Sequence, residues 1–413
     1  MGRPDRSQQA AFRKDFLFAI EKLFEGSTNL TGWVKSPSFK EYLMSYRVIQ
    51  WATGSMGKTC LRAVIDHPDL ELVGLLVYGK SKTGRDAGDI ARCDTTGVIA
   101  TRDIDAILAL DADVVLHCPR IQPPYAHHNK EICQLLASGK NVISINGHTY
   151  PQYWGPAYME EISEACAKGG TTLFGTGLNP GFITEKIATA ASGLCTRIDR
   201  IHVSEIVDCT SIPNPNYIFD VLGFGASLHE ADLNESSWPP AELMTGMYSE
   251  VVAQLVDSLG LTLDHIESDH EVLPATKDLE TAAGRIKKGT VSVTHWRWHG
   301  IVGGKRFFTL SIRWMMENAP PAKKDYNLWD VKILGIPEVE ISVNLVTPKY
   351  TGYKTMAEQY AVAGSVINSI PAVCAAPAGI LRTPVFAAYR PRFRSKFPPA
   401  TAPTPSVRSC ETS

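Results

Sequence analysis

Short runs rich in β-branched residues alternate with helix-length segments across residues 47–175, and this alternation constrains the fold more than any other feature. Proline opens the segments that start at Pro123 and Pro156, and Gly139 and Gly169 follow them, as helix ends prefer. Strands are expected at residues 47–51, 70–78, 113–118, 141–145 and 171–175, with helices at 58–67, 123–138 and 156–168. Repeated β–α units of this length predict a doubly wound parallel sheet.

The period of the apolar residues changes to two after about residue 197. Even-numbered positions are apolar in residues 308–314 and odd-numbered positions in residues 339–345, as in strands that bury one face. The pair Gly303-Gly304 separates two strand-like stretches and predicts a hairpin turn. We therefore expect an α/β domain followed by an α+β domain with a largely antiparallel sheet.

These changes of pattern divide the chain into five segments. Residues 1–43 carry an apolar stripe at helical spacing and are expected to form an N-terminal extension that docks as an amphipathic helix, or that precedes a native start at Met44. The other segments are a dinucleotide-binding domain at 44–180, a substrate and dimerisation domain at 181–354, a closing helix and loop at 355–381, and a disordered, basic, proline-rich tail at 382–413.

Composition narrows the class of partner. Hydrophobic residues make up 44% of the 413 positions and charged residues 20%, as in ordinary globular proteins. The formal net charge of −2 gives no general attraction to nucleic acid or acidic lipid, so a small molecule is the expected partner. The nine cysteines include no C-x-x-C pair, which favours a cytoplasmic setting. The longest uncharged stretch contains prolines, and no membrane partner is expected.

A glycine turn, within V-I-Q-W-A-T-G-S-M-G, joins the first expected strand to the first helix. It matches the dinucleotide pattern G-x-G-x-x-G with Ala52 in place of the first glycine. Gly54 would let the backbone approach a pyrophosphate, Gly57 would let helix and strand pack closely, and the first N–H groups of the helix would face the anion. The coenzyme-binding residues expected here are Ala52, Thr53, Gly54, Ser55, Met56 and Gly57.

The string G-K-T that starts at Gly57 also matches the end of a phosphate-binding loop, G-x-x-x-x-G-K-[ST], which is an alternative to the dinucleotide site. That motif needs a glycine where Ala52 stands. An ATPase also needs an apolar strand that ends in a magnesium-binding aspartate, and neither 72–78 nor 114–118 ends in one. The pattern therefore favours a dinucleotide.

The second expected strand ends near Tyr78, about 20 residues after the glycine turn, where a dinucleotide-binding protein contacts the adenosine ribose. The loop Y-G-K-S-K-T-G-R has no carboxylate that could accept from a ribose 2′-hydroxyl. Lys80, Ser81, Lys82 and Arg85 could instead hold a 2′-phosphate. We therefore expect NADP as coenzyme, with NAD as the alternative, although a basic surface loop would explain any one of these residues equally well.

A third turn, G-T-G-L-N-P-G-F, follows the strand expected at 171–175 and precedes another apolar segment. Ligands of open α/β sheets bind outside the carboxyl ends of the strands, so Asn179 and Pro180 are expected to contact the coenzyme. An ordinary turn is the alternative, because N-P-G is favourable turn chemistry anywhere.

The segments V-I-Q-W-A-T-G-S-M-G, Y-G-K-S-K-T-G-R-D-A-G-D and G-T-G-L-N-P-G-F together resemble the dihydrodipicolinate reductase-like superfamily, in its branch of 2,4-diaminopentanoate dehydrogenases and native amine dehydrogenases. The resemblance extends over about residues 45–380. It implies a Rossmann domain, a following α+β domain that forms the substrate pocket and a homodimer contact, and reversible NAD(P)-dependent chemistry at a carbon bearing an amine, imine or carbonyl.

The chain departs from that branch at the expected active site. In amine-active members, the strand equivalent to 141–145 leads into two glutamates a few residues before a Tyr-Pro pair, and one glutamate is the catalytic acid or base. Aligning on Tyr150-Pro151 places Asn146 and Gly147 at those positions, and neither exchanges a proton at neutral pH. Asn146 is instead expected to contact the coenzyme.

His148 and Tyr150 are the expected catalytic replacements. An imidazole has an ordinary pKa near 6.5, which suits proton transfer, and Tyr150 could donate a proton or pack beneath the coenzyme. Glu205 and Asp208, which lie on or just after the strand expected at 201–207, are alternatives.

The expected function is hydride transfer by an NAD(P)H-dependent oxidoreductase to or from a small carbonyl, imine or amine substrate. The alternative is a non-catalytic NAD(P)-binding sensor or pseudoenzyme that kept the fold and lost the acid. No metal site is expected, because His127 and His128 are adjacent on an expected helix and would point about 100° apart.

Overall fold

The structure is a computed structural model that describes residues 45–234, 237–317, 328–349 and 352–382, together with 386, 389–390 and 392–393. Arg47–Arg390 forms one compact unit, and Met1–Tyr46 with Pro391–Ser413 belongs to another. The helix expected within residues 1–43 lies outside the described residues, as does almost all of the tail expected at 382–413. The domain boundaries expected within the chain remain predictions.

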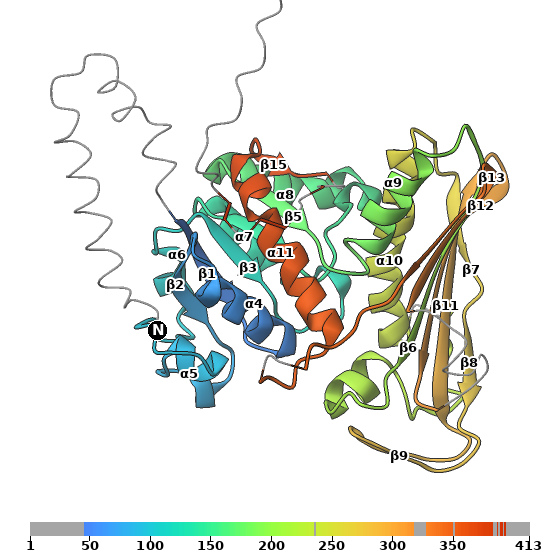
Figure 1. The fold of residues 1–413 in the computed structure, drawn as a ribbon, viewed down its shortest axis with the longest axis horizontal. Helices are drawn as coiled ribbons and strands as arrows, with labels where there is room; N and C mark the ends of the chain where they lie inside the picture. The colour runs from blue at the N-terminus through green and yellow to red at the C-terminus, as the bar shows by residue number, and fades with distance from the viewer. Residues whose placement is uncertain are drawn as a thin grey trace, which may run out of the picture. The chain divides into compact units, whose positions relative to one another are not determined.

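A six-stranded sheet with the order β15-β5-β4-β3-β1-β2 is formed by five strands from the first half of the larger unit and by β15 from its end (Figure 1). Strand β1 pairs in parallel with β3, β3 with β4, β4 with β5, and β5 with β15. The chain continues to opposite sides of β1, which is the doubly wound order of a Rossmann sheet and confirms the expected fold. The strands are β1 Tyr46–Trp51, β2 Leu70–Leu76, β3 Val114–His117, β4 Asn141–Ser144, β5 Thr172–Gly175 and β15 Gly379–Ile380.

Helices cover both faces of this sheet. Helices α7 (Asn129–Ala137) and α8 (Pro156–Gly169) pack on the face that bears the side chains of Ile49 and Trp51. On the other face, α4 (Ser55–Asp66) packs against α11 (Ala357–Ala375), so the late helix returns to the first sheet (Figure 1). The shorter helical elements around the sheet are η1 Lys80–Lys82, α5 Ala87–Ala91, α6 Ile104–Leu108, η2 Tyr125–His128 and η3 Pro151–Trp154.

All three expected helices differ from the structure at an end. The helix expected at 58–67 begins earlier, at Ser55, because it starts directly after the glycine turn, with Gly54 as its N-cap. The helix expected at 123–138 is divided into a 3-10 turn, η2, and the helix α7. Pro124 is extended and disfavours a helical residue before it, so helical structure begins only at Tyr125. At the end of α8, Gly170 rather than Gly169 adopts the left-handed conformation that closes the helix.

A seven-stranded sheet forms the second half of the unit, with β8 paired to β11 beside the order β14-β13-β6-β12-β11-β7. Its neighbouring strands are antiparallel except for β6 and β12, which are parallel, so the expected antiparallel sheet is confirmed in the main. Gly303 and Gly304, both at positive φ, make the expected turn between β11 and β12. The strands are β6 Arg197–Asp208, β7 His265–Ser268, β8 Glu271–Pro274, β11 Val291–Val302, β12 Lys305–Met315, β13 Trp329–Ile336 and β14 Val339–Val343.

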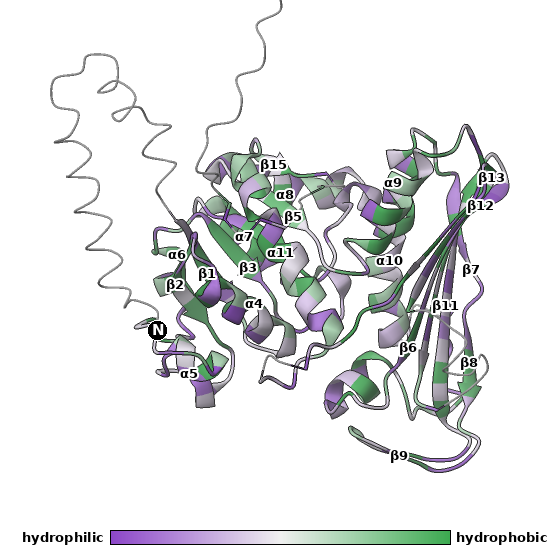
Figure 2. Ribbon diagram, viewed as in Figure 1, coloured by the Kyte–Doolittle hydropathy of each residue, from purple (hydrophilic) through white to green (hydrophobic). Residues whose placement is uncertain are grey.

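Helix α10 (Pro239–Ser258) packs on the inner face of this second sheet. Trp296, Trp298 and Phe308 point into the same core and are fully buried. Figure 2 shows hydrophobic residues along α10 and along β3 of the first sheet. The remaining elements are η4 Ile183–Ala188, α9 Thr189–Ser192, η5 Asn216–Val221, β9 Leu279–Thr281 and β10 Gly284–Ile286.

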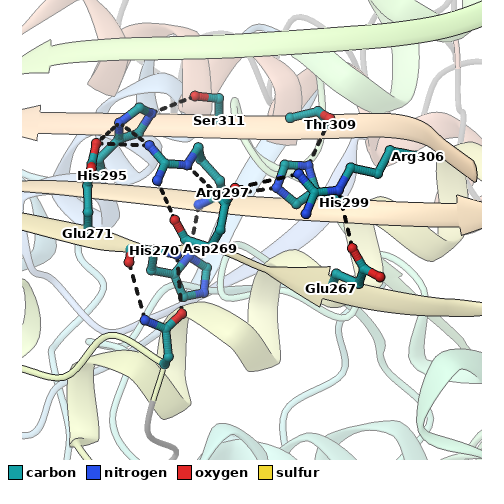
Figure 3. Close-up of polar contacts among 11 residues, drawn as sticks. Glu267, Asp269, His270, Glu271, His295, Arg297, His299, Arg306, Thr309 and Ser311 are labelled. Carbon is teal, nitrogen blue, oxygen red and sulfur yellow. Dashed lines mark hydrogen bonds and ion pairs between the residues drawn. The ribbon is translucent and has the colours of Figure 1, made fainter.

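The outer face of the second sheet carries polar side chains, but some of them are buried and not exposed to solvent. The Thr309 and Ser311 hydroxyls, on β12, hydrogen bond to His299 Nδ1 at 3.0 Å and to His295 Nε2 at 2.8 Å on β11 (Figure 3). Both β12 residues are buried, so the expectation that this strand buries only one face was wrong at its centre. Imidazole side chains from the neighbouring strand cover the opposite face there.

Of the helices in the described residues, none combines the length and the hydropathy that a membrane span requires.

Candidate active site

The turn after β1 leaves its backbone open to a ligand. Ala52 has a φ of 71°, in the left-handed region, and its N–H donates to the Leu76 carbonyl oxygen at 3.0 Å. A Cβ placed on Gly54 would meet no described atom within 4 Å, whereas a Cβ on Gly57 would collide with the Ala52 carbonyl oxygen. Gly54 therefore leaves room for a phosphate to approach, and Gly57 lets α4 pack against the strand.

Helix α4 begins at Ser55 with an uncapped, positive end. Within the described residues, no side chain accepts from its first N–H groups, and its first turn holds no acidic residue. These N–H groups and the helix dipole favour a bound anion. The six residues expected from the sequence, Ala52 to Gly57, thus lie in one turn that has the form a pyrophosphate needs.

Lys82 folds back onto this turn from η1. Its Nζ donates to the Thr53 carbonyl oxygen at 2.8 Å and to Thr53 Oγ1 at 2.9 Å. Burial lowers the pKa of Lys82, and the positive charges of Lys58 and Arg85 lower it further. A concentration of positive charge therefore lies beside the glycine turn, where it would attract phosphate groups.

Tyr78, Lys80 and Ser81 lie apart from that contact. Lys80 and Ser81 are exposed on η1. The Tyr78 hydroxyl accepts from Trp51 Nε1 at 2.9 Å and donates to the Glu131 carboxylate at 3.0 Å. The loop after β2 contains no carboxylate of its own between Tyr78 and Arg85, but α7 brings the Glu131 carboxylate to the end of β2. The sequence did not indicate this contact.

Asn146 and Asn179 lie just beyond the carboxyl ends of the neighbouring strands β4 and β5. Asn146 Nδ2 donates to the Pro119 carbonyl oxygen at 2.9 Å, and Asn179 Nδ2 donates to Glu205 Oε2 at 2.8 Å. The Asn179–Pro180 peptide is cis, and Tyr248 donates to the Asn179 carbonyl oxygen at 3.2 Å. Asn179 Oδ1 is buried without a hydrogen-bond partner among the described residues, so it can accept from a bound amide such as a carboxamide.

His148 is held as a neutral imidazole. Its Nε2 donates to Asn129 Oδ1 at 3.0 Å, and its ring stacks on Tyr125 with centroids 6.1 Å apart. Burial lowers the pKa of His148 to about 3, and the charges of His117 and His128 add to this. At neutral pH the His148 ring is therefore uncharged and its one N–H is bonded to Asn129, and the catalytic role expected for it remains a prediction.

Tyr150 lies in different surroundings from His148. Burial raises the pKa of the Tyr150 hydroxyl, and the hydroxyl interacts with Asp257 near the end of α10, with the charge of Arg382 close by. Its backbone N–H instead donates to Glu250 Oε2 at 3.0 Å. The structure does not bring the ring groups of the two expected catalytic residues into one cluster.

Tyr125 occupies the place where a side chain at position 147 would lie. Gly147 has a φ of 86°, and a Cβ there would collide with the Tyr125 hydroxyl, while the Tyr125 ring packs against Gly246 of α10. The hydroxyl accepts from the His148 N–H at 3.0 Å and donates to Glu250. A tyrosine hydroxyl bonded to a carboxyl group therefore lies beside Gly147, one of the two positions where the resemblance predicts a missing glutamate.

Glu250 is a fully buried carboxyl group on α10. Its Oε1 accepts from Trp154 Nε1 at 2.9 Å, in addition to the contacts from Tyr150 and Tyr125. Burial raises the pKa of Glu250 to about 7, against the lowering effect of these donors. Sequence reasoning missed it, although an acidic residue within the apolar run of residues 243–256 was a usable signal.

The two alternative carboxylates have separate environments. Glu205 on β6 accepts from Asn179, from Trp314 Nε1 at 2.8 Å and from Trp329 Nε1 at 2.7 Å, and burial raises its pKa. It therefore anchors the turn after β5. Asp208 accepts from the N–H and hydroxyl of Thr210, as a turn-capping residue does.

Comparisons with known proteins match this chain to dehydrogenases and reductases. Residues 48–137 match the family model "Dihydrodipicolinate reductase, N-terminus". An amine dehydrogenase of Streptomyces virginiae is 30% identical over 270 residues, which cover 62% of this chain and 71% of that protein. A 2,4-diaminopentanoate dehydrogenase of Acetoanaerobium sticklandii is 24% identical over 331 residues, covering 79% of this chain and 90% of that protein.

Among solved structures, the amine dehydrogenase from Mycobacterium smegmatis shares the fold. It superposes with a TM-score of 0.68 at 20% sequence identity, covering 85% of this chain and 99% of that chain. The Rossmann sheet, the open glycine turn and these relatives define the chain as an NAD(P)-dependent oxidoreductase. It belongs to the amine dehydrogenase family, within the dihydrodipicolinate reductase-like proteins, as the sequence motifs indicated.

Proposed function

We propose that this chain uses NADP(H) to transfer a hydride to or from a small, partly apolar carbonyl, imine or amine compound. The observation that carries the proposal is the arrangement of two sites on one edge of the six-stranded sheet: the open turn at Gly54 after β1, and Asn146 and Asn179 after β4 and β5. Ligands of such sheets lie outside this edge. The relatives' names, which refer to amines and to diaminopentanoate, support the substrate class.

The preference for NADP rests on charge. Burial lowers the pKa of Lys82, and the nearby charges of Lys58 and Arg85 lower it further, while Lys82 contacts the glycine turn through Thr53. Such an arrangement favours the extra phosphate of NADP over the free ribose hydroxyl of NAD. Lys80 and Ser81 are exposed beside it and are proposed as further phosphate contacts.

Tyr125 and Glu250 are proposed to supply the proton that accompanies the hydride. The coenzyme, when bound, supplies the hydride itself. Burial raises the pKa of Glu250 to about 7, so it gains and loses a proton near neutral pH, and the Tyr125 hydroxyl extends from it to Gly147, where the resemblance predicts a missing glutamate. His148 and Tyr150 then act through their backbone N–H groups, which hold Tyr125 and Glu250.

The experiment is a reductase assay. The full chain is mixed with NADPH and a panel of ketones, aldehydes and imines, and the loss of nicotinamide absorbance is followed. Tyr125→Phe is expected to lower kcat about 100-fold without changing NADPH affinity. Tyr158→Phe is the matched control, because Tyr158 bonds to Asn129 in the same network and is expected to keep its activity. Equal losses in both variants would contradict the role of Tyr125.

A non-catalytic NADP-binding sensor is the second candidate function. Asn146 and Gly147 stand where the family's glutamates are expected, and the Glu250 carboxyl already accepts several hydrogen bonds. Tight NADPH binding without consumption across the whole panel would support the sensor over the enzyme.

The homodimer and the cytoplasmic setting implied by the sequence also remain proposals. Light scattering on the purified protein, which measures its molar mass in solution, tests the homodimer.

A further inference from the structure

Three ligand-type side chains converge on the face of the first sheet that α7 covers. His117 ends β3, His128 ends η2, and Glu131 lies in the first turn of α7. His117 Nε2 is 2.8 Å from Glu131 Oε1, and His128 Nδ1 is 2.7 Å from the same oxygen. The three donor atoms all lie within 4.8 Å of one another.

The hydrogen-bond pattern of His128 leaves a place for a cation. His128 Nε2 is 2.9 Å from the Arg120 carbonyl oxygen, which can only accept, so Nε2 carries a hydrogen. In a neutral imidazole the lone pair of Nδ1 then faces the Glu131 carboxylate oxygen at 2.7 Å. Two acceptors at this distance need a proton between them. A divalent ion would take the place of this proton and bind both atoms, with the two side chains moving slightly apart.

The donor set is one that zinc uses. Two imidazole nitrogens and one carboxylate oxygen make up the protein ligands of open zinc sites, with a fourth position left for another oxygen. The contact from His128 Nε2 to a backbone carbonyl is the outer hydrogen bond that orients a metal-binding histidine. The Tyr78 hydroxyl, 3.0 Å from Glu131 Oε2, offers an oxygen for the fourth position.

The cluster is buried but reachable. His117 is fully buried, while His128 and Glu131 line a cavity of about 480 Å³ that Tyr78 and His127 also border. An ion can therefore reach the donor atoms through this cavity. His127 lines the same cavity without belonging to the donor group.

We propose that His117, His128 and Glu131 bind one divalent transition-metal ion of the zinc type. The ion would fix the start of α7 to the end of β3, beside Tyr78 rather than beside Asn146 and Asn179, so the site is separate from the proposed hydride transfer. This revises the expectation of no metal. That expectation was based on the pair His127 and His128 alone. The sequence does not show that the fold brings Glu131 and His117 next to His128.

The test is a titration of the full, tag-free chain, stripped with a chelator, with Co²⁺. The wild type is expected to bind one equivalent, with the intense visible absorption of a four-coordinate site, and Zn²⁺ is expected to displace it. His128→Gln and Glu131→Gln are expected to bind Co²⁺ at least about tenfold more weakly. His127→Gln is the matched control and is expected to bind as the wild type does.

Thermal unfolding gives a second measurement, which does not depend on whether the variants of the metal-binding residues fold. Zn²⁺ is expected to raise the Tm of the wild type and of His127→Gln, because an ion that binds only the folded state stabilises it. A wild type that shows only the weak spectrum of hydrated Co²⁺ and no rise in Tm would overturn the proposal. Equal affinity in the wild type and in a folded His128→Gln variant would also overturn it.

Discussion

Ala52 is an alanine in a conformation that suits glycine, with a φ of 71°. The strain of a Cβ in this region is partly offset by the greater freedom of glycine in the unfolded chain. Ala52→Gly is therefore expected to raise the free energy of unfolding by about 0.5–1 kcal/mol. Denaturant unfolding measures this.

Gly54→Ala provides the control for that measurement. Gly54 has a φ of −66° and open space around the missing Cβ, so the variant is expected to keep its stability. A loss of stability in Ala52→Gly would mean that the left-handed conformation at Ala52 is not strained.

The buried carboxyl group of Glu185 allows a test of how burial changes stability with pH. It is fully buried on η4, and neither carboxylate oxygen has a hydrogen-bond partner of normal geometry among the described residues. Burial raises its pKa to about 7, and the backbone amide of Gly181 and the charge of Lys186 oppose this only in part. Glu185→Gln removes the charge and keeps the shape of the side chain, so it is expected to stabilise the protein at pH 8.

The pH dependence of that gain has a definite sign. Below about pH 4.5 both the folded and the unfolded chain hold the Glu185 proton, and the variant gains nothing. As the pH rises to about 7, the unfolded chain loses this proton before the folded chain does, so the wild type loses stability. Unfolding experiments at pH 4, 6 and 8 should show a gain that grows to roughly 3 kcal/mol. A gain that is constant with pH would contradict the shift.

At the scale of an element, the loop after β2 is proposed to set the preference for NADP over NAD. Lys82→Gln removes the charge that contacts Thr53 and is expected to weaken NADPH binding about tenfold, with a smaller effect on NADH. Lys80→Gln, on the same 3-10 turn but exposed, is the matched variant and should have the smaller effect. Fluorescence titrations at fixed ionic strength measure both. An unchanged ratio of the two affinities in Lys82→Gln would place the 2′-phosphate elsewhere.

The turn after β4 limits any attempt to restore the family's glutamate. Gly147→Glu is expected to destabilise the protein by about 2 kcal/mol or more, because its Cβ meets Tyr125 and its φ of 86° disfavours a side chain. Adding Tyr125→Ala removes the collision and should recover part of the loss in Tm. A stable single variant would show that the Tyr125 ring moves aside easily.

Helices, strands and turns could be predicted where the pattern that indicates them lies within a short stretch of sequence. Strands β1 to β5 of the first sheet, the glycine turn and the Gly303-Gly304 hairpin follow from periodicity and turn chemistry in short windows. The sixth strand, β15, lies in the segment that was expected to be a loop after the closing helix. The parallel pairing of β6 with β12 depends on where distant strands meet, and local periodicity carries no such information. Tyr125 and Glu250 meet for the same reason, so the sequence could not predict that these two side chains lie beside Gly147. That the family's glutamate is missing there stays a prediction.

Across the whole molecule, residues of the second sheet and of α10 hold the loops of the first. Glu205 on β6 binds Asn179, Tyr248 on α10 binds the Asn179 carbonyl, and Glu250 binds the Tyr150 N–H. The turns after β4 and β5 therefore depend on the later part of the chain for their conformation. The residue types in these loops indicated a coenzyme site, whereas their supports became visible only in the fold.

Titration calorimetry of the full chain with NADPH tests the central claim most directly. The wild type is expected to bind one NADPH per chain, more tightly than NADH and less tightly as salt increases. Gly54→Ala is expected to bind more weakly at unchanged stability, because its Cβ enters the space left for the phosphates. The absence of binding heat with either coenzyme, on wild-type protein that unfolds cooperatively, would contradict the account.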